Sequence, residues 1–303
     1  MAHVMTTHTP PATRLLMCAP EHFAVSYAIN PWMDPQSWAR DTRARAAAAH
    51  EWADLHRKLG ELGAMIELVP AASGLPDLVF TANAAVVLDR QVLLARFRHP
   101  ERQGEEAHFE AAFRSLEARG RIDGVRKLPE GIVLEGAGDC VFDATRKLFW
   151  LGYGQRSDAD AKRPVEEMFA QEVAALELAD ARFYHMDTAL SALPGGEVMY
   201  LPEAFTAAGR GEIRDRVAAP DRIELGIEDG CRLAANAVCL GNTLVMSACS
   251  TRLGAELEER GYDVATTPLP SFLRSGGSAF CLTLRLDRRS VPLADAVDQA
   301  AVA

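Results

Sequence analysis

A segment of the same plan recurs about every 50 residues, and this repeat constrains the fold more than any other feature of the chain. Each copy consists of a short polar residue, an apolar strand, a turn and a second apolar strand. The residues that start the copies are Asn83, Asp139, Asp187 and Asn236, which are separated by 56, 48 and 49 positions. Cys281 follows Asn236 after 45 positions, and Asn30 precedes Asn83 by 53. The repeat predicts about five equivalent units of roughly 50 residues each.

The stretches between the paired strands carry apolar or small residues at helical spacing. We expect helices over 41–62, 105–119, 163–175 and 250–260, followed by short strands such as 65–69 and 263–267. A ββαβ unit repeated in this way either stacks as an open solenoid or closes into a ring. Because no unit at either end has the polar face of a cap, we predict a closed ring. The expected fold is an α/β propeller with five blades and pseudo-fivefold symmetry.

Composition excludes several classes of function. The chain has 303 residues, 49% of them hydrophobic, and a formal net charge of −10. This charge disfavours nucleic acid as a partner, because phosphates bind to clusters of Lys and Arg. No apolar run approaches the roughly 20 residues that span a bilayer, so we expect no membrane partner. Residues 1–14 are polar and rich in Thr and Pro, and we expect a disordered tail there and a single domain over residues 15–303.

The six cysteines are too sparse for a disulfide scaffold. The N-terminal segment also has no apolar stretch typical of a secretory signal, so we expect a cytoplasmic protein with reduced thiols. No two cysteines form a Cys-x-x-Cys pair, and their spacings do not match a zinc ligand set. We therefore predict neither a metal nor an organic cofactor.

A closed ring would gather the polar residue of every unit around one central pocket. The candidate pocket residues are mostly hydrogen-bond acceptors: Asn30, Asn83, Glu135, Asp139, His185, Asp187, Asn236 and Cys281. Acidic and amide side chains suit a cation with many N–H groups. Guanidinium, which presents five donors in a fixed fork, is the leading candidate for the ligand.

Two residues could carry nucleophilic and proton-transfer chemistry. Cys281 follows the glycines of Gly276-Gly277 and is expected to open a strand; it is either an exposed nucleophile or a core cysteine beside a turn. His185 and Asp187 are two apart at the start of a predicted strand, so both would point to one face. They are either an acid/base pair or a hydrogen-bonded core histidine beside a strand-end carboxylate.

Further charged residues flank these positions. Glu135 and Asp139 lie four apart around two glycines, which would let both reach one site unless they form an acidic surface turn. Several arginines follow the second strand of a predicted hairpin, where they either clamp a substrate carboxylate or are solvated. They are Arg96, Arg98, Arg102 and Arg156.

Taken in order, these motifs resemble the guanidine-modifying enzymes of the pentein fold. This superfamily includes arginine deiminases, dimethylarginine dimethylaminohydrolases, arginine dihydrolases and amidinotransferases. The resemblance extends from about residue 15 to residue 286. It rests on Pro-Asp-Leu-Val-Phe-Thr-Ala-Asn ending at Asn83, Glu-Gly-Ala-Gly-Asp ending at Asp139, Gly-Tyr-Gly-Gln-Arg-Ser around Arg156, His185-Met-Asp187, and Gly-Gly-Ser-Ala-Phe-Cys-Leu-Thr around Cys281. Each motif is weak alone, but five in the correct order on a repeat of this length form a specific pattern.

The resemblance implies a hydrolase that acts on C–N bonds of a linear guanidine, arginine or an N-methylated arginine. Cys281 would attack the guanidinium carbon, His185 would act as general acid and base, and Glu135 would bind the reacting group and help to hold the imidazole charged. The substrate would be held by Asn83 and Asp187, with Asp139, Asn30, Arg96, Arg98 and Arg156 as further binding residues. The expected partner is this small guanidino substrate. Homodimerisation is left open.

Two departures from the common pattern bear on the branch within the superfamily. Asn83 stands where deiminases and dimethylarginine hydrolases usually carry an acidic residue, and an amide can also donate to a ureido oxygen. Together with Ala-Ile-Asn-Pro-Trp-Met around Asn30, this resembles the arginine dihydrolases, which remove both nitrogens and leave ornithine, ammonia and carbon dioxide. Between Glu135 and Asp139 there is one residue more than usual, so either carboxylate could be catalytic; we expect a bulge.

Two alternatives remain open within the same fold. An amidinotransferase would use the same covalent intermediate but pass the amidino group to an amine. A non-catalytic pentein protein that binds ribosomes would share the ring without the Cys/His pair.

Overall fold

Four of the sheets are each formed by three strands that follow one another in sequence. The computed structural model describes residues 13–291. In every sheet the middle strand runs antiparallel to the first and parallel to the third. The four sheets are β3 (Ala85–Leu88), β4 (Gln91–Leu94) and β5 (Gly124–Arg126); β6 (Cys140–Asp143), β7 (Leu148–Tyr153) and β8 (Glu172–Glu177); β9 (Leu190–Ala192), β10 (Val198–Tyr200) and β11 (Arg222–Glu224); and β12 (Val238–Leu240), β13 (Thr243–Met246) and β14 (Asp263–Thr266).

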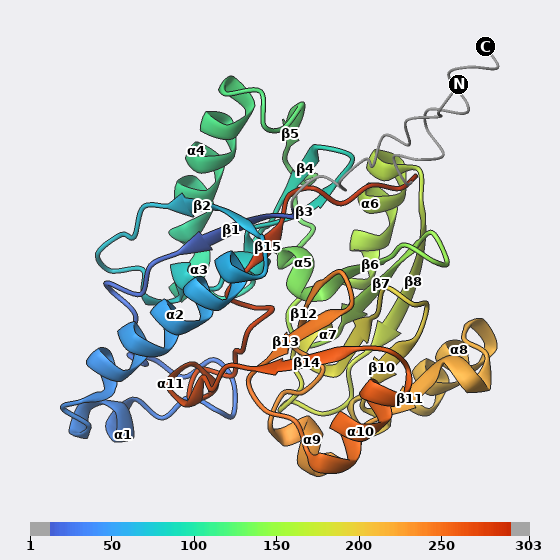
Figure 1. Ribbon diagram of the computed structural model, residues 1–303. Coiled ribbons are helices and arrows are strands. Elements are labelled where there is room, and N and C mark those ends of the chain that lie inside the picture. Colours follow the sequence, from blue (N-terminus) through green and yellow to red (C-terminus); the bar gives the residue numbers. More distant parts are fainter. Residues whose placement is uncertain (1–12, 292–303) are drawn as a thin grey trace, which may run out of the picture.

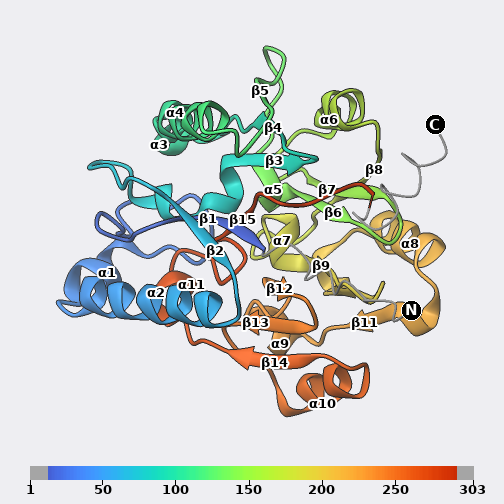
Figure 2. The same ribbon diagram turned by 45° about the horizontal axis from the view of Figure 1, so that its top comes forward.

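The fifth sheet joins strands from both ends of the chain and closes the ring. Its strands are β15 (Leu284–Arg285), β1 (Arg14–Cys18) and β2 (Met65–Val69) in that order. The backbone N–H of Leu286 donates to the carbonyl oxygen of Arg14 at 2.9 Å, which continues the antiparallel pairing of β15 with β1. The predicted closed ring of five ββαβ-type units is therefore confirmed (Figures 1 and 2).

Arg14 opens β1, so the tail predicted for 1–14 ends too late, and residues 1–12 lie outside the described part.

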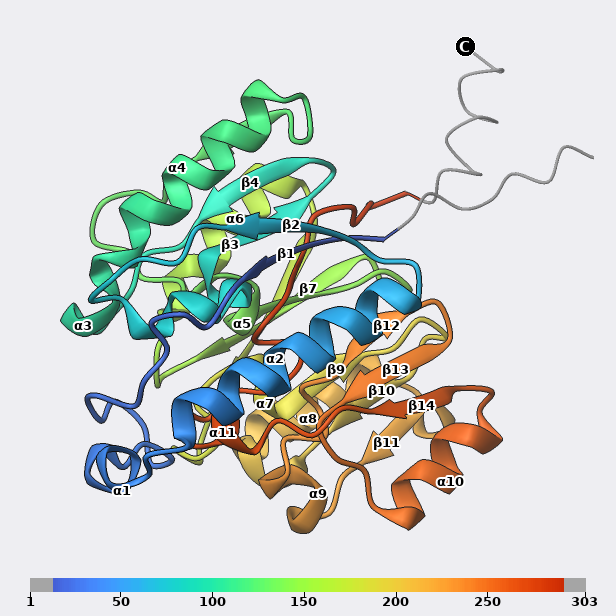
Figure 3. The same cartoon turned by 60° about the vertical axis from the view of Figure 1, so that its left-hand side comes forward.

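One longer helix follows the middle strand of each sheet and lies at the periphery of the ring (Figure 2). In α2 the buried positions recur at helical spacing and end in Leu55 and Leu59, both completely buried. Figure 3 views the molecule from the side that α2 covers. These helices are α2 (Ala44–Glu61), α4 (Glu105–Ala118), α6 (Lys162–Phe169), α8 (Ala207–Arg216) and α10 (Thr251–Glu259).

Three of the four predicted helices are confirmed, and the predicted range of the fourth was too long. The helix expected over 163–175 ends at Phe169, because Ala170 takes the left-handed conformation (φ 51°) and β8 starts at Glu172. Helix α8 was not predicted. Its sequence has two glycines and only one large buried apolar side chain, Ile213, so it shows no helical repeat of apolar residues.

Short helical turns precede the first strands of the sheets and carry the repeated polar residues to the centre. The turn η2 (Thr81–Ala84) holds Asn83, α5 (Gly136–Asp139) holds Asp139 and α7 (Met186–Ala189) holds Asp187. Asn30 was expected to be equivalent but precedes no strand; it lies in the irregular connection between β1 and α1 (Pro35–Arg40). The remaining short elements are α3 (Pro100–Gln103), α9 (Ile227–Cys231), α11 (Pro270–Leu273), η1 (Pro76–Val79), η3 (Ala159–Ala161), η4 (Pro202–Ala204) and η5 (Ala219–Asp221).

Helices long and apolar enough to cross a membrane do not occur between residues 13 and 291.

Candidate active site

Cys281 lies in a buried turn just before the last strand. It was expected to open that strand, but β15 starts only at Leu284, and Cys281 is held in the turn by other bonds. The turn follows a close-packed glycine pair. Gly276 has φ +78°, and a Cβ atom there would lie 2.8 Å from side-chain atoms of both Trp32 and Tyr184; at Gly277 it would lie 2.4 Å from the ring of Phe80. The glycines therefore let the turn approach these aromatic rings.

The thiol of Cys281 contacts two polar side chains. Its Sγ atom lies 3.2 Å from Oδ2 of Asp187 and 3.0 Å from Nδ2 of Asn236. Burial raises the pKa of the Cys281 thiol well above its usual value, and the neighbouring Asp187 raises it further. The thiol is therefore protonated and donates to Asp187.

Asp187 is a buried carboxyl group with only one oxygen paired. Oδ1 has no hydrogen-bond partner within the described residues, while Oδ2 accepts from Cys281. Burial raises the pKa of Asp187 to about 7. A buried unpaired carboxylate oxygen is costly, and a cationic ligand with N–H donors would compensate it.

His185 directly precedes α7 and pairs with Glu135. Its Nε2 lies 2.9 Å from Oε2 of Glu135, and its Nδ1 lies 3.5 Å from Nδ2 of Asn83. Nε2–H therefore donates to the carboxylate, and Nδ1 faces the amide. Burial lowers the pKa of His185 to about 4, against the opposing effect of Glu135. The imidazole is thus neutral near pH 7.

The shared strand face predicted for His185 and Asp187 is wrong. Asp187 lies within the helical turn α7, where residues two apart do not face the same way. His185 contacts Glu135 while Asp187 contacts Cys281, so the two side chains serve different partners in one buried cluster.

Glu135 is the carboxylate that contacts the imidazole most closely. It is completely buried and also accepts from Nη1 of Arg156 at 3.0 Å and from the backbone N–H of Arg98 at 3.2 Å. Burial alone would raise its pKa, but the charge of Arg156 and the hydrogen bond from His185 outweigh burial and hold the pKa of Glu135 well below its usual range. Glu135 is therefore charged.

Asp139 has a different set of partners. Its Oδ2 accepts from Oγ of Ser157 at 2.6 Å, its Oδ1 accepts from the backbone N–H of Met186 at 3.1 Å, and its Oδ2 lies 3.8 Å from Nε2 of His185. Burial raises the pKa of Asp139 well above its usual value. It anchors the start of α7 beside His185, and no part of the structure brings it into contact with Cys281.

The expected bulge between the two carboxylates is a helical turn instead. Gly136, at φ +64°, and Gly138 lie within α5 and pack on Asn83; a Cβ at Gly138 would lie 2.1 Å from Nδ2 of Asn83. The extra residue of this motif is thus accommodated by α5. The small residues keep Asn83 in contact with the segment of Glu135.

Arg102 fixes the orientation of the Asn83 amide. Its Nη1 donates to Oδ1 of Asn83 at 2.9 Å, so the NH2 group of Asn83 must face His185 and the carbonyl oxygen of Glu135. Arg102 itself is buried and makes a bidentate ion pair with Glu105 at 2.7 and 2.8 Å. From the sequence, Arg102 is only one of several arginines that follow a strand and either bind a substrate carboxylate or are solvated.

Of the three arginines expected to bind substrate, the structure brings one guanidinium into the cluster. Arg156 contacts Glu135 and donates to the carbonyl oxygen of Ile29 at 3.2 Å. The guanidinium of Arg96 instead binds the carbonyl oxygens of residues 128, 129 and 132. That of Arg98 binds the carbonyl oxygen of Arg156 and the carboxylate of Asp158. Both hold loops in place.

Sequence reasoning missed Asp77. This carboxyl group is buried and accepts from the hydroxyl of Tyr27 at 2.9 Å and that of Ser275 at 3.4 Å. Burial raises the pKa of Asp77, which the charges of Arg102 and Arg156 oppose. The only signal in the sequence was its place in the motif that ends at Asn83.

Asn30 links the connection after β1 to the turn around Gly276 and Gly277 by a hydrogen bond. Its Nδ2 donates to the carbonyl oxygen of Ser275 at 3.0 Å, and its Oδ1 accepts from the backbone N–H of Trp32. Cys281, His185 and Glu135 are at most 2% exposed.

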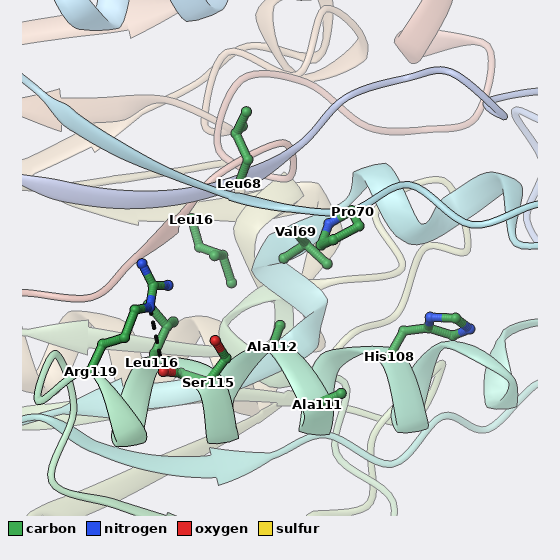
Figure 4. Close-up of a pocket in the computed structure, with 10 residues that line it drawn as sticks. All are labelled: Leu16, Leu68, Val69, Pro70, His108, Ala111, Ala112, Ser115, Leu116 and Arg119. Atoms are coloured by element: carbon green, nitrogen blue, oxygen red, sulfur yellow. Dashed lines mark hydrogen bonds between the residues drawn. The ribbon is translucent and has the colours of Figure 1, made fainter.

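A separate cavity of about 330 Å³ lies between β2 and α4 (Figure 4). Its lining is mainly apolar, with His108 and Arg119 as its basic side chains. None of the candidate site residues lines it, and it contains neither a thiol nor a carboxylate. Groups of three or more His, Cys, Asp or Glu side chains that could hold a metal are likewise not found among residues 13–291.

The comparison with known proteins agrees with this arrangement. The family described as N,N dimethylarginine dimethylhydrolase, eukaryotic, matches residues 19–288. The bifunctional arginine dihydrolase/ornithine cyclodeaminase ArgZ of Synechocystis is 41% identical over 92% of this chain, which spans only 38% of that relative. The N(G),N(G)-dimethylarginine dimethylaminohydrolase of Mycobacterium tuberculosis is 35% identical over 92% of this chain and 87% of its own length.

A solved structure extends the likeness to three dimensions. The N-terminal domain of an Asn→Ser variant of ArgZ, covalently bound to a reaction intermediate, superposes with a TM-score of 0.85 at 40% identity. The match covers 92% of this chain and all of that domain. The family match over residues 19–288 agrees with the closed ring of five units and with the buried Cys281 and His185. The chain therefore belongs to the N,N-dimethylarginine dimethylhydrolase family of the guanidine-modifying pentein superfamily.

Proposed function

We propose that the protein hydrolyses C–N bonds of the guanidinium group of arginine, as an arginine dihydrolase, with Cys281 as nucleophile and His185 as general acid and base. The observation that carries the proposal is the buried thiol of Cys281 beside the half-paired carboxyl group of Asp187. A guanidinium group placed there would bind the free oxygen of Asp187. Its positive charge would favour the thiolate, which burial and the neighbouring Asp187 disfavour.

The first half of the reaction transfers the amidino group to sulfur. The sulfur of Cys281 forms a bond to the guanidinium carbon, and the thiol proton passes to His185, whose imidazole is neutral near pH 7. The imidazolium formed is stabilised by the charged Glu135 at 2.9 Å. His185 then gives the proton to the departing nitrogen as the C–N bond breaks, so that an amine leaves and a thioether remains.

The second half uses water. A water molecule loses a proton to His185 and attacks the amidino carbon; the C–S bond breaks, Cys281 recovers that proton, and the hydroxyl group added to the carbon releases its own proton to solvent. The product carries a ureido group. A second passage through the same steps would release the remaining terminal nitrogen as ammonia and leave a carbamate on the ornithine nitrogen, which loses carbon dioxide to give ornithine.

Charged groups around Arg102 support an amino-acid substrate over a simple guanidine. Asp77 can bind an α-ammonium group, and the guanidinium groups of Arg102 and Arg156 can bind an α-carboxylate. All three side chains are buried. The charges of both arginines oppose the rise in the pKa of Asp77 that burial causes, so both lie near this carboxyl group. The carbonyl oxygen of Ile29, which accepts from Arg156, adds an acceptor for the ammonium group.

The orientation of Asn83 supports dihydrolase over dimethylarginine hydrolase activity. Because Arg102 occupies its oxygen, Asn83 presents N–H groups toward His185. Such a donor can bind the oxygen of a ureido group, which the second passage requires and a carboxylate would repel. A covalent intermediate is known for the relative ArgZ, in line with the thioether proposed here.

Product analysis tests the proposal. The protein is incubated separately with arginine, N,N-dimethylarginine, citrulline and agmatine, and ammonia, dimethylamine, citrulline and ornithine are quantified. We expect ornithine and ammonia from arginine, and little reaction of agmatine, which lacks the carboxylate. Dimethylamine as the main product would favour the dimethylarginine hydrolase activity. A new guanidino compound on addition of glycine would favour an amidinotransferase, and no product from any substrate would refute the proposal.

A further inference from the structure

Asn236 is bound to the candidate nucleophile at two points. Its Oδ1 accepts from the backbone N–H of Cys281 at 3.1 Å, and its Nδ2 lies 3.0 Å from Sγ of the same residue. The second hydrogen of Nδ2 is directed to the carbonyl oxygen of Asp187 at 3.2 Å. Asn236 is completely buried, so water cannot replace these bonds.

The chemistry of the partners fixes which end of the amide faces the sulfur. A backbone N–H can only donate, so the atom that faces the N–H of Cys281 must be the oxygen of Asn236, and the NH2 group must face Sγ and the carbonyl oxygen of Asp187. The amide cannot turn over without placing its NH2 group against the N–H of Cys281. It therefore offers the sulfur a hydrogen-bond donor.

Residue 236 also holds the backbone of the turn. Its carbonyl oxygen accepts from the backbone N–H of Phe280 at 3.2 Å, next to the bond that its side chain accepts from Cys281. Two consecutive N–H groups of the turn are thus tied to the segment that leads into β12. No strand pairing reaches Cys281, because β15 starts at Leu284.

We propose that Asn236 sets the reactivity of Cys281, by donating a hydrogen bond to the sulfur while its oxygen holds the backbone of the turn. This inference rests on the proposed role of Cys281 as nucleophile. Aspartate in this place would keep the oxygen for the N–H of Cys281 but would add a second carboxylate beside a sulfur that already contacts Asp187. An amide is the neutral group of this size that both accepts and donates.

The donor would act each time negative charge is present on the sulfur. A hydrogen bond to a charged acceptor is stronger than one to a neutral acceptor. The bond from Nδ2 of Asn236 would therefore stabilise the thiolate before attack and weaken once the sulfur has become a neutral thioether. It would strengthen again when the C–S bond breaks, and Asn236 keeps its proton throughout.

Alkylation of Cys281 tests this inference without a substrate. The rate of modification by iodoacetamide is measured against pH in the full chain and read from the mass of the peptide that contains Cys281. In Asn236→Asp the pKa of the thiol should rise by at least about one unit, so the rate at pH 7 should fall about tenfold or more. In Asn236→Ala, which adds no charge, the rate at pH 7 should also fall about tenfold. Above the thiol pKa, the rates of all variants should converge.

Turnover gives a second readout. In both variants kcat for arginine should fall by a factor similar to the alkylation rate, while KM should stay within about twofold because Asn236 is not placed against the substrate. A merely structural role would not shift the pH profile of alkylation. Melting temperatures confirm folding, and Asn236→Ser, also neutral, replaces Asn236→Ala if the latter does not fold.

A matched control lies in the hairpin that follows Asn236. Asn242 is exposed in the turn between β12 and β13, and Asn242→Asp makes the same chemical change there. It should leave both rates unchanged. Wild-type rates in Asn236→Ala or its serine replacement, with slow alkylation only in Asn236→Asp, would show an effect of charge alone and overturn the inference. A wild-type enzyme that alkylates at Cys281 but turns over no guanidino substrate would instead refute the proposed function.

Discussion

The two halves of the candidate site differ in how their charges are balanced. Around His185, the carboxylate of Glu135 is matched by the guanidinium group of Arg156 at 3.0 Å and accepts from the imidazole at 2.9 Å. Around Cys281, the carboxyl group of Asp187 has no cationic partner, and one of its oxygens has no hydrogen bond within the described residues. The charge of Glu135 is thus balanced by another side chain, whereas that of an ionised Asp187 is not balanced by any of the described residues.

This difference indicates where the substrate's charge would act. Glu135, itself paired with Arg156, holds the imidazole of His185 in place through the hydrogen bond to Nε2. Cys281 and Asp187 share a proton until a guanidinium group arrives, because burial raises the pKa of both groups. The thiolate of Cys281 would then form only when a substrate is bound.

Removal of the nucleophile should have the largest effect. Cys281→Ala should lower kcat for ammonia release from arginine by at least about 10⁴-fold, because the thioether can no longer form. Cys249→Ala, at a cysteine outside the site, should keep wild-type activity. Residual turnover of Cys281→Ala within about 100-fold of wild type would contradict a covalent mechanism.

Breaking the paired half should have the next largest effect. Glu135→Gln removes the charge that stabilises imidazolium, and kcat should fall by about 10²- to 10³-fold. The measurement is steady-state ammonia release, with thermal melting to confirm folding. Glu130→Gln, an exposed residue five positions earlier, is the control and should behave as wild type. Equal activity of both variants would remove Glu135 from the mechanism.

A change at Asp187, in the half of the site without a cationic partner, should weaken substrate binding and at the same time speed the alkylation of Cys281. In Asp187→Asn the guanidinium group loses a charged partner, so KM for arginine should rise by about 10- to 100-fold. The thiol loses the carboxyl group that raises its pKa, so iodoacetamide should modify Cys281 faster at pH 7. Slower alkylation in this variant would show that Asp187 activates the thiol instead.

The two halves of the site should also change the stability of the protein with pH, in opposite directions. This effect is smaller than the effects on activity. Burial lowers the folded-state pKa of His185 to about 4, below the usual 6.5, so its stabilising contribution is present above pH 6.5 and is lost as the pH falls through 4. Burial raises the pKa of Asp187 from 3.8 to about 7, so its contribution is present below pH 3.8 and is lost as the pH rises through 7. These are opposite signs.

Melting curves check the second of these signs. Asp187→Asn should gain stability relative to wild type at pH 8, by up to about 4 kcal/mol for a three-unit difference, and gain much less at pH 5. A gain that is the same at both pH values would mean that Asp187 does not titrate with the raised pKa.

The ring could be predicted from the sequence because each unit repeats one local pattern. Polar residues followed by paired apolar strands marked Asn83, Asp187, Asn236 and Cys281, and the structure brings them to the centre. Helix α8 could not be predicted, because Ile213 is its only large buried apolar residue. Local patterns identify an element only where burial recurs along it.

The side-chain partners could be predicted less well, because they depend on loops distant in sequence. Arg96 and Arg156 occupy similar positions after a strand, yet Arg96 binds carbonyl oxygens some 30 residues away, while Arg156 turns to Glu135. Asp77 is buried by Tyr27 and Ser275, which lie 50 and 198 positions from it. No local signal specifies these contacts.

The central claim, that Cys281 carries the guanidino carbon, can be tested by one measurement. His185→Gly is mixed with S-methyl-L-thiocitrulline, an arginine analogue whose methanethiolate can leave without a proton from His185, and the mass of the intact protein and of the peptide containing Cys281 is recorded. Without the imidazole that activates water, the thioether should accumulate, and the mass of Cys281 should increase by that of an amidino group with its substituent. An unchanged mass in this variant, or an adduct on another residue, would contradict the account.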